Sequence, residues 1–449
     1  MTKRAIPAKI LLPLCLSLLA QAAFGLDTGL AAIADDSQLR LAARGAWLAE
    51  SPARVLAMRP ALNSLPGGDK VEIRSAAGRG EITVTFARQS SQNGQFPGWA
   101  QGSWEFTRNA VSGETTLVRV FPRSDQYTYI QFRPFNEDRV QMDVLLYDAY
   151  AVSGLVLPVS MDRLSVMPLA DILRLAGSRF PARYFEPKPD DYRDTRQLVS
   201  DVRKNLPGLN FADDGAIDQN GHFVYINGGE IQEGEPGLNC SGFAKWLIDG
   251  ILRPVTGERL EIPPLKAPFG DRGSSFTEPF EALRDPFFGL DWIRNLAART
   301  WTVLRSQNFA TLEEIEVRSA PFSQINIRRG SSVTMRPFPG FLENAGFGIE
   351  GLLPLLYTLA VDEPNRFFLG AVNTDTHAPT TPENLRGRPR MRQFFHVAAL
   401  VPYFDANGIF RVAVFESAAE TSINAVRSRY PSGHNISLVR LPVERAFDP

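Results

Sequence analysis

Hydrophobic and polar residues change their spacing several times along this chain of 449 residues. Between Val71 and Val159 they alternate in short segments separated by glycine, asparagine, proline and serine, a pattern typical of antiparallel β-strands. The strands expected there are 71–74, 81–86, 103–107, 116–121, 127–132 and 140–147. Residues 27–60 have helical spacing instead. We therefore predict that residues 26–160 form an N-terminal β-rich domain with a short helical lead.

Beyond residue 160, helical and strand-like patterns alternate. Helices are expected at 168–177, 194–205, 287–304 and 351–359, and strands at 222–226, 366–372, 396–404 and 409–415. Asp405-Ala-Asn-Gly408, between the last two strands, is a hairpin signal. The chain is thus predicted to be α+β, with residues 161–449 forming a second domain.

A further helix is expected directly after Asn239, because asparagine is a favoured N-cap and the apolar residues that follow recur on one helical face. Cys240 then lies in the first turn. There, unpaired backbone N–H groups and the positive end of the helix dipole favour a thiolate over a thiol. Ser241 and Gly242 are small enough to let a substrate or another element approach the sulfur. The alternative interpretation is a cysteine that serves as a small buried hydrophobe.

The first 25 residues have the three parts of a secretory signal peptide, namely basic residues, an apolar core at 10–19 and small residues near 20–25. The core is too short to span a bilayer, and the residues before Cys15 do not fit a lipidation site. We expect a protein exported to the periplasm or the extracellular space, without a membrane anchor. Removal of this segment leaves Cys240 without a disulfide partner in a compartment where pairing is the norm. A chemical role for Cys240 would explain why an unpaired thiol is kept in that compartment.

Composition narrows the choice of partner. Lys and Arg together number 48 and Asp and Glu 49, so bulk charge does not favour a nucleic-acid partner. No glycine-rich phosphate loop lies between a strand and a helix, and the histidines and cysteines lack the spacing of a zinc site. We expect no cofactor, no metal and a monomer.

Tyr225-Ile-Asn-Gly-Gly229, followed by Gly237-Leu-Asn-Cys-Ser-Gly-Phe243, resembles the signature of the NlpC/P60 cysteine peptidases. The resemblance implies a papain-like fold, a nucleophilic cysteine and peptides of bacterial cell-wall peptidoglycan as substrate. It also implies that the hydroxyl of Tyr225 lies near the cysteine and the oxyanion. The sequence departs from the family in having Asn239 where Asp is usual. It departs also in the long separation of its cysteine from its candidate histidine, which implies an insertion at about 254–392 in a catalytic domain of residues 161–449.

His396 is the candidate general base, because it begins a strongly apolar strand, whereas His377 and His434 occur in turn-like segments. The resemblance agrees, since such enzymes place the histidine at the start of one barrel strand and an orienting polar residue on the next. His434 is the alternative base.

Glu416 is the candidate partner of His396. A hairpin centred near residue 406 brings the end of its second strand back to the start of its first. A carboxylate there can accept the imidazole N–H and stabilise the imidazolium by its charge. A shifted register would substitute Ser417, and Asn435 is a more distant alternative.

Three further residues are weaker candidates for contact with substrate. Ser241 adjoins the cysteine. Arg390 and Arg392 belong to Arg386-Gly-Arg-Pro-Arg-Met-Arg392, which is either a solvated basic loop or a clamp for a substrate carboxylate or phosphate.

These observations lead to three hypotheses for function. In the preferred one, an exported thiol protease, a hydrolase, cleaves a peptide bond of cell-wall peptidoglycan by means of Cys240, His396 and Glu416. The backbone N–H of Cys240 and the hydroxyl of Tyr225 would stabilise the oxyanion. The second hypothesis is an amidase or acyltransferase with a substrate outside the wall. The third is a catalytically inactive binding protein of the same fold.

Overall fold

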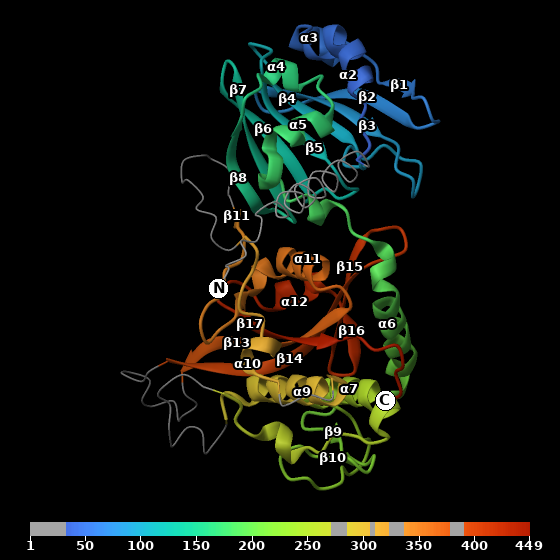
Figure 1. The fold of residues 1–449 in the computed structure, drawn as a ribbon, viewed down its shortest axis with the longest axis vertical. Coiled ribbons are helices and arrows are strands. Elements are labelled where there is room, and N and C mark those ends of the chain that lie inside the picture. The colour runs from blue at the N-terminus through green and yellow to red at the C-terminus, as the bar shows by residue number, and fades with distance from the viewer. Residues whose placement is uncertain (1–32, 271–284, 306–309, 323–335, 378–389) are drawn as a thin grey trace, which may run out of the picture. The chain divides into compact units, whose positions relative to one another are not determined.

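A computed structural model of the chain describes residues 33–270, 285–305, 310–322, 336–377 and 390–449 (Figure 1). The chain divides into two compact units: unit 1 contains residues up to Glu186 together with 327–336, and unit 2 contains 187–326 and 337–449. The structure is mixed α+β with a β-rich N-terminal region, as predicted. The predicted signal peptide, with Cys15, lies outside the described residues.

Unit 1 is built on an antiparallel sheet whose first eight strands lie side by side in sequence order. All six predicted strands are present, and the first and eighth strands add to them. In β2 the alternate side chains of Val71 and Ile73 are buried, as the period of two in the sequence predicts. The strands are β1 (Ala61–Ser64), β2 (Lys70–Ala77), β3 (Glu81–Arg88), β4 (Ser103–Asn109), β5 (Thr115–Phe121), β6 (Tyr129–Asn136), β7 (Arg139–Leu146) and β8 (Ala149–Leu157), with β11 (Arg336–Pro337) next in the order.

Short helices flank this sheet in the sequence. They are α2 (Ser37–Ala43), the π-helical turn η1 (Arg44–Leu48), α3 (Pro52–Ala57), α4 (Met161–Leu164), α5 (Leu169–Ala176) and the 3₁₀ turns η2 (Gly177–Arg179) and η3 (Ala182–Phe185). The unit ends at Glu186 rather than at residue 160, so the predicted boundary was too early. The reason is that α5 buries its apolar side chains and packs against β8, so it belongs to the β-rich unit.

Unit 2 contains a six-stranded antiparallel sheet in the order β12-β17-β13-β14-β15-β16. The strands are β12 (Phe347–Gly348), β13 (Arg366–His377), β14 (Arg390–Phe404), β15 (Phe410–Glu416), β16 (Ala419–Thr421) and β17 (Asn435–Pro442). β13 lies between β14 and β17, in the middle of the sheet, although it falls within the interval 254–392 that was expected to be an insertion. The strand expected at 366–372 therefore belongs to the main sheet, and this interval supplies part of the core of unit 2.

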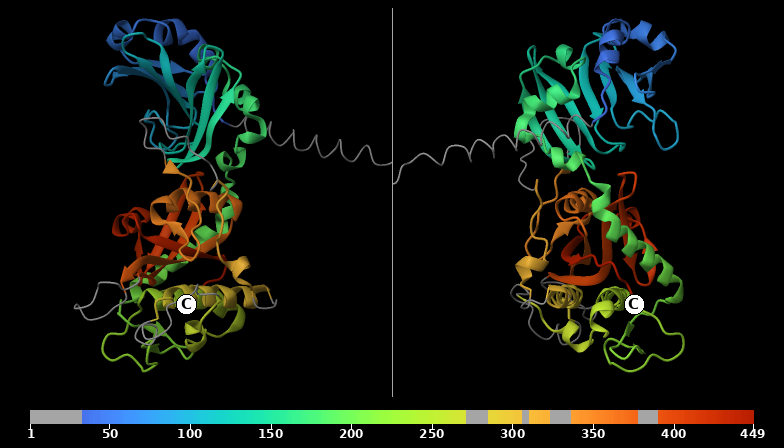
Figure 2. Two further views of the ribbon diagram at one scale, coloured as in Figure 1. Left: turned by 90° about the vertical axis from the view of Figure 1, so that its left-hand side faces the viewer. Right: turned by 45° about the vertical axis from the view of Figure 1, so that its right-hand side comes forward.

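Helices cover both faces of the sheet. Figures 1 and 2 show α7 and α9 side by side along one face and α11 on the other, and α7 and α9 are in contact. The helices and 3₁₀ turns of unit 2 are η4 (Pro189–Tyr192), α6 (Arg193–Asn205), η5 (Leu206–Gly208), α7 (Cys240–Thr256), η6 (Pro263–Lys266), α9 (Phe288–Arg305), α10 (Leu312–Ile315), η7 (Ile349–Gly351), α11 (Leu352–Asp362) and α12 (Ile423–Arg429). The predicted helices near 194–205, 287–304 and 351–359 are therefore confirmed.

A small two-stranded sheet, β9 (Ala216–Ile217) with β10 (Phe223–Val224), precedes α7. Its backbone lies against the first turn of that helix. A Cβ atom added at Gly242 would lie 1.8 Å from the carbonyl oxygen of Gly215, so a larger residue cannot stand after Ser241. The small size of Gly242 thus lets the backbone before β9 pack close to the cysteine, as expected from the sequence.

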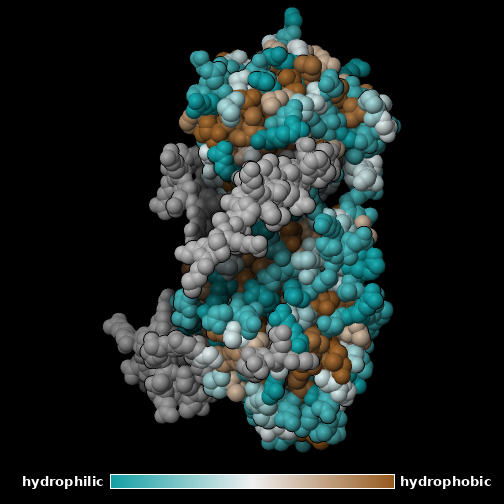
Figure 3. Space-filling model, in the orientation of Figure 1, coloured by the Kyte–Doolittle hydropathy of each residue, from teal (hydrophilic) through white to brown (hydrophobic). Residues whose placement is uncertain are grey.

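Large apolar side chains are exposed at scattered positions in both units. On the face drawn in Figure 3 they form small groups among polar residues. Examples are Leu41 and Val111 in unit 1, and Phe211, Ile231 and Leu342 in unit 2. Scattered exposure of this kind is ordinary for a globular protein. Among the described residues, no helix is both long enough and apolar enough to cross a bilayer.

Candidate active site

The candidate nucleophile is the first residue of α7. Asn239 caps this helix as predicted, its side-chain oxygen accepting a hydrogen bond of 2.7 Å from the N–H of Gly242. Cys240 is a free, half-buried cysteine whose Sγ lies 4.0 Å from the hydroxyl of Ser241. Within the described part of the chain, the backbone N–H of Cys240 has no hydrogen-bond acceptor. The sulfur therefore adjoins a free donor at the positive end of a helix.

His396 is brought to this sulfur by an irregularity in β14. The strand pairs His396 with Val372 but Phe394 with Asn373, so Phe395 is an extra residue, a β-bulge. Bulges bend a strand and redirect side chains, and they recur beside active sites. The imidazole of His396 is close enough to Cys240 for hydrogen bonding and charge between the two side chains to shift both pKa values. The sequence pattern did not reveal this bulge.

Glu416 completes a connected set of side chains. Its Oε2 lies 2.5 Å from Nε2 of His396, which leaves Nδ1 as the ring nitrogen available to the thiol. Both side chains are largely buried, with 15% of His396 and 7% of Glu416 exposed. The structure brings together Cys240, His396 and Glu416, the three residues predicted to be catalytic.

The route by which Glu416 reaches His396 differs from the prediction. The hairpin pairs Ala399 with Phe415, so its register is two residues away from one that would pair His396 with Glu416. The carboxylate reaches the imidazole diagonally, a spacing that long side chains can span. The alternative Ser417 lies in the tight turn that follows, with a positive φ of 49°.

The pKa shifts in this cluster favour the charged forms of both Cys240 and His396. Burial, the largest influence on Cys240, raises the pKa of its thiol. The hydrogen bond and charge of His396, with hydrogen bonds from the Val397 N–H and Ser241, outweigh that effect, so the net pKa is lowered. Burial lowers the pKa of His396, but its contacts with Cys240 and Glu416 raise it to about 9. Both shifts have the direction that favours a thiolate beside an imidazolium.

A second contact holds the carboxylate. Arg429, the last residue of α12, donates a hydrogen bond of 2.6 Å from Nη1 to the other oxygen of Glu416. Burial raises the pKa of Glu416, but the hydrogen bonds and charges of His396 and Arg429 outweigh it and keep this pKa below its ordinary value. Sequence reasoning missed Arg429, because only the folded hairpin brings α12 to β15.

Two aromatic rings border the histidine. The Tyr430 ring lies 5.9 Å from that of His396 and 5.6 Å from that of His434, measured between centroids. His434 Nδ1 is 3.0 Å from the carbonyl oxygen of Pro431. Tyr430 is thus close to both histidines, and of the two it is His396 whose pKa is raised by an interaction with Cys240. Tyr430 was also missed from the sequence.

The remaining predicted site residues lie in different surroundings. Tyr225, 36% exposed, follows β10 and forms no side-chain hydrogen bond with any described residue, so its role at the oxyanion stays a prediction. Ser241 is buried next to the sulfur. Arg392 donates to Asn373 and pairs with Asp375 at 2.8 Å, so its charge is already partnered. The side chain of Arg390 lies outside the described residues.

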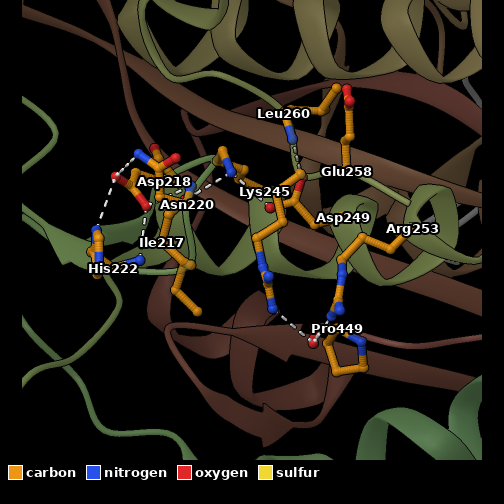
Figure 4. A network of polar contacts seen from close by, with 12 residues as sticks. Ile217, Asp218, Asn220, His222, Lys245, Asp249, Arg253, Glu258, Leu260 and Pro449 are labelled. Atoms are coloured by element: carbon orange, nitrogen blue, oxygen red, sulfur yellow. Dashed lines mark hydrogen bonds and ion pairs between the residues drawn. The ribbon is translucent and has the colours of Figure 1, made fainter. Parts of the chain in front are cut away.

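A separate buried ion pair anchors α7 (Figure 4). Lys245 Nζ lies 2.6 Å from Oδ2 of Asp249 and donates to the carbonyl oxygen of Ile217 in β9 at 2.7 Å. Asp249 also accepts a hydrogen bond of 2.9 Å from the N–H of Leu260. These bonds fix the helix that carries Cys240 to the strand before it and the loop after it.

A cavity of about 530 Å³ lies elsewhere in unit 2. Its lining includes Arg294 and Glu316, whose buried side chains form an ion pair of 2.8 Å, and none of the residues placed near Cys240. Among the described residues, no group of three or more histidine, cysteine, aspartate and glutamate side chains is placed to hold a metal ion.

The chain is thus a two-unit α+β protein with a β-rich N-terminal region and a clustered cysteine, histidine and glutamate in its second unit. A family model described as "Domain of unknown function (DUF8515)" matches residues 29–184, about a third of the chain. The match ends close to Glu186, the end of the first part of unit 1, and includes none of the residues around Cys240. No NlpC/P60 family model matches. No curated protein and no solved structure matches the chain.

Proposed function

We propose that unit 2 is the catalytic part of an exported cysteine hydrolase of the NlpC/P60 type, with a papain-like fold, that cleaves a peptide bond in bacterial cell-wall peptidoglycan. The observation that carries the proposal is the position of His396. It contacts Cys240 on one side and Glu416, at 2.5 Å, on the other. A nucleophile, a base and a group that orients the base are the minimum set for acyl transfer by a cysteine.

The reaction begins with the thiolate of Cys240. Its sulfur attacks the amide carbonyl carbon, and a C–S bond forms. The resulting oxyanion accepts a hydrogen bond from the free backbone N–H of Cys240. The imidazolium of His396 then donates its proton to the leaving nitrogen as the C–N bond breaks. The product is a thioester on Cys240, a free amine and a neutral imidazole.

Water completes the cycle. Neutral His396 takes a proton from water, whose oxygen attacks the thioester carbonyl, and the C–S bond breaks to release the carboxylic acid and restore the thiolate. Glu416 holds Nε2 throughout, so Nδ1 stays directed at the reacting atoms. Tyr225 is proposed as a second oxyanion donor, and Ser241 and the arginine pair Arg390 and Arg392 as weaker substrate contacts.

Hydrolysis of purified peptidoglycan and its soluble stem peptides, followed by mass spectrometry, tests this proposal. We expect Cys240→Ala and His396→Gln to lower the rate by about a thousandfold or more, as removal of a member of such a set does. His222→Gln is the matched control, because its exposed ring pairs with Asp218 instead. Activity should decline above about pH 9, where the His396 imidazolium loses its proton.

Other outcomes separate the alternatives. Cleavage of a non-wall amide, dependent on Cys240 and His396 but without action on peptidoglycan, would establish the amidase or acyltransferase hypothesis. Retention on purified cell wall without cleavage, together with a thiol unreactive toward iodoacetamide, would establish a catalytically inactive binding protein.

A further inference from the structure

The C-terminal end of α12 lies beside Glu416. Ser422 caps the start of this helix by accepting a hydrogen bond from the N–H of Ala425, and Val426 buries its side chain, so the helix is fixed against its surroundings. Its last residue, Arg429, then reaches Oε1 of Glu416 at 2.6 Å while His396 occupies Oε2. Each carboxylate oxygen is therefore committed to a different partner.

We propose that Arg429 is a positioning residue: it holds one oxygen of Glu416 so that the other oxygen is directed at His396. The proposal rests on the proposed function of this site. An ordinary surface ion pair is the alternative, since Arg429 is 46% exposed. Glu416, however, is only 7% exposed, and a buried carboxylate needs partners for both oxygens.

The charged and titratable groups around this carboxylate come from three elements. His396 faces it from β14, and Arg429 and Tyr430 face it from the end of α12, while Cys240 on α7 lies beyond the imidazole. The next acidic side chain along the hairpin, Glu420, is bound by both Nε and Nη2 of Arg203. Glu416 is thus the carboxylate that stabilises the His396 imidazolium.

Two roles of Arg429 predict opposite effects of its removal. As a mere positive charge near His396, it would oppose the imidazolium, and its loss would raise the pKa of His396. As the group that keeps Glu416 ionised and oriented, it supports the imidazolium through the carboxylate, and its loss would lower that pKa. The sign of the shift therefore distinguishes positioning from charge alone.

The experiment is an NMR titration of the His396 imidazole in the intact protein, with its signal assigned by His396→Gln. We expect Arg429→Gln and Arg429→Met to lower the pKa of His396 by about one unit, a tenfold change in the protonation equilibrium. Arg429→Lys should restore most of the difference. Arg203→Gln is the matched control, because it removes an arginine of similar exposure from Glu420 on the neighbouring strand β16. It should leave the pKa of His396 unchanged.

A pKa of His396 that is unchanged or raised in both Arg429→Gln and Arg429→Met would overturn the inference. The comparison of two variants, each checked for the native circular dichroism spectrum, guards against loss of folding in either one. The readout needs no substrate. If the wild type cleaves no amide while the Arg429 variants still lower the pKa, the proposed function fails and the positioning role stands.

Discussion

Helix α7 carries two polar clusters that differ in exposure, in hydrogen-bond partners and in the direction of their pKa shifts. The pair Lys245 and Asp249 is wholly buried, at 0% and 1% exposure, and its other hydrogen bonds go to the backbone. Burial is the largest influence on both members, lowering the pKa of Lys245 and raising that of Asp249, so both shifts oppose charge. The cluster around Cys240 is partly exposed, and its shifts favour charge.

The difference shows how a perturbed pKa can be interpreted. Burial perturbs any ionisable pair, and a pair saturated by backbone hydrogen bonds serves to fix the fold. At Cys240 and His396 burial also opposes charge, but contacts between the side chains overcome it, and Cys240 keeps some exposure. Charge maintained against burial in an accessible group is the pattern expected of a reactive site.

The largest effect that would test this comparison is on stability. Lys245→Met leaves Asp249 buried without its partner, so we expect a loss of about 3–5 kcal/mol in the free energy of opening α7. Hydrogen exchange of the α7 amides measures it locally, which avoids treating two units as a single transition.

The double variant Lys245→Met/Asp249→Leu is the control. It removes both charges, so the loss should be smaller than in the single variant, although the Ile217 carbonyl and Leu260 N–H remain without side-chain partners. A loss below about 1 kcal/mol in Lys245→Met would show that the pair does not anchor the helix.

The second prediction concerns the reactivity of Cys240. His396→Gln removes the contacts that lower the thiol pKa and leaves burial, which raises it. We expect the pKa to rise by about one to two units, so that alkylation by iodoacetamide at pH 7 slows by about ten- to a hundredfold. His434→Gln should have little effect, because His396, and not His434, is the histidine that lowers the pKa of Cys240. Equal effects of the two variants would contradict the assignment of His396 as base.

How far sequence could predict the fold depended on how local the signal was. Strands β2 to β7 follow from alternation within each segment. β8 was missed because Ser153 and Gly154 interrupt its apolar run. A strand was expected at 366–372, but its central place in the sheet depends on pairing not only with β14, the next strand along the chain, but also with β17, which is distant in sequence. Pairing across long separations leaves no periodic trace in either strand.

The same distinction applies to the candidate site. Cys240 and its cap Asn239 were predictable from adjacent residues. The contact of His396 with Glu416 was predicted with the wrong register, because a bulge at Phe395 and the hairpin offset cannot be derived from strand patterns. No sequence pattern near Arg429 indicates its contact with Glu416, because that contact depends on where the folded chain places the end of α12.

The smallest expected effect is at Asn239, the N-cap of α7. This is the position at which the NlpC/P60 signature usually has Asp. Asn239→Ala removes the hydrogen bond to the Gly242 N–H and should cost about 1 kcal/mol, again measured by hydrogen exchange of α7. Asn239→Asp keeps the cap but loses the 3.3 Å hydrogen bond that Nδ2 donates to the carbonyl oxygen of Asp213, so we expect it to cost less stability than Asn239→Ala. It also places a negative charge next to the sulfur, which should raise the thiol pKa and slow alkylation at pH 7 several-fold. If Asn239→Asp instead left alkylation unchanged, the neutral cap would not contribute to the acidity of Cys240, and His396 would account for the thiolate without it.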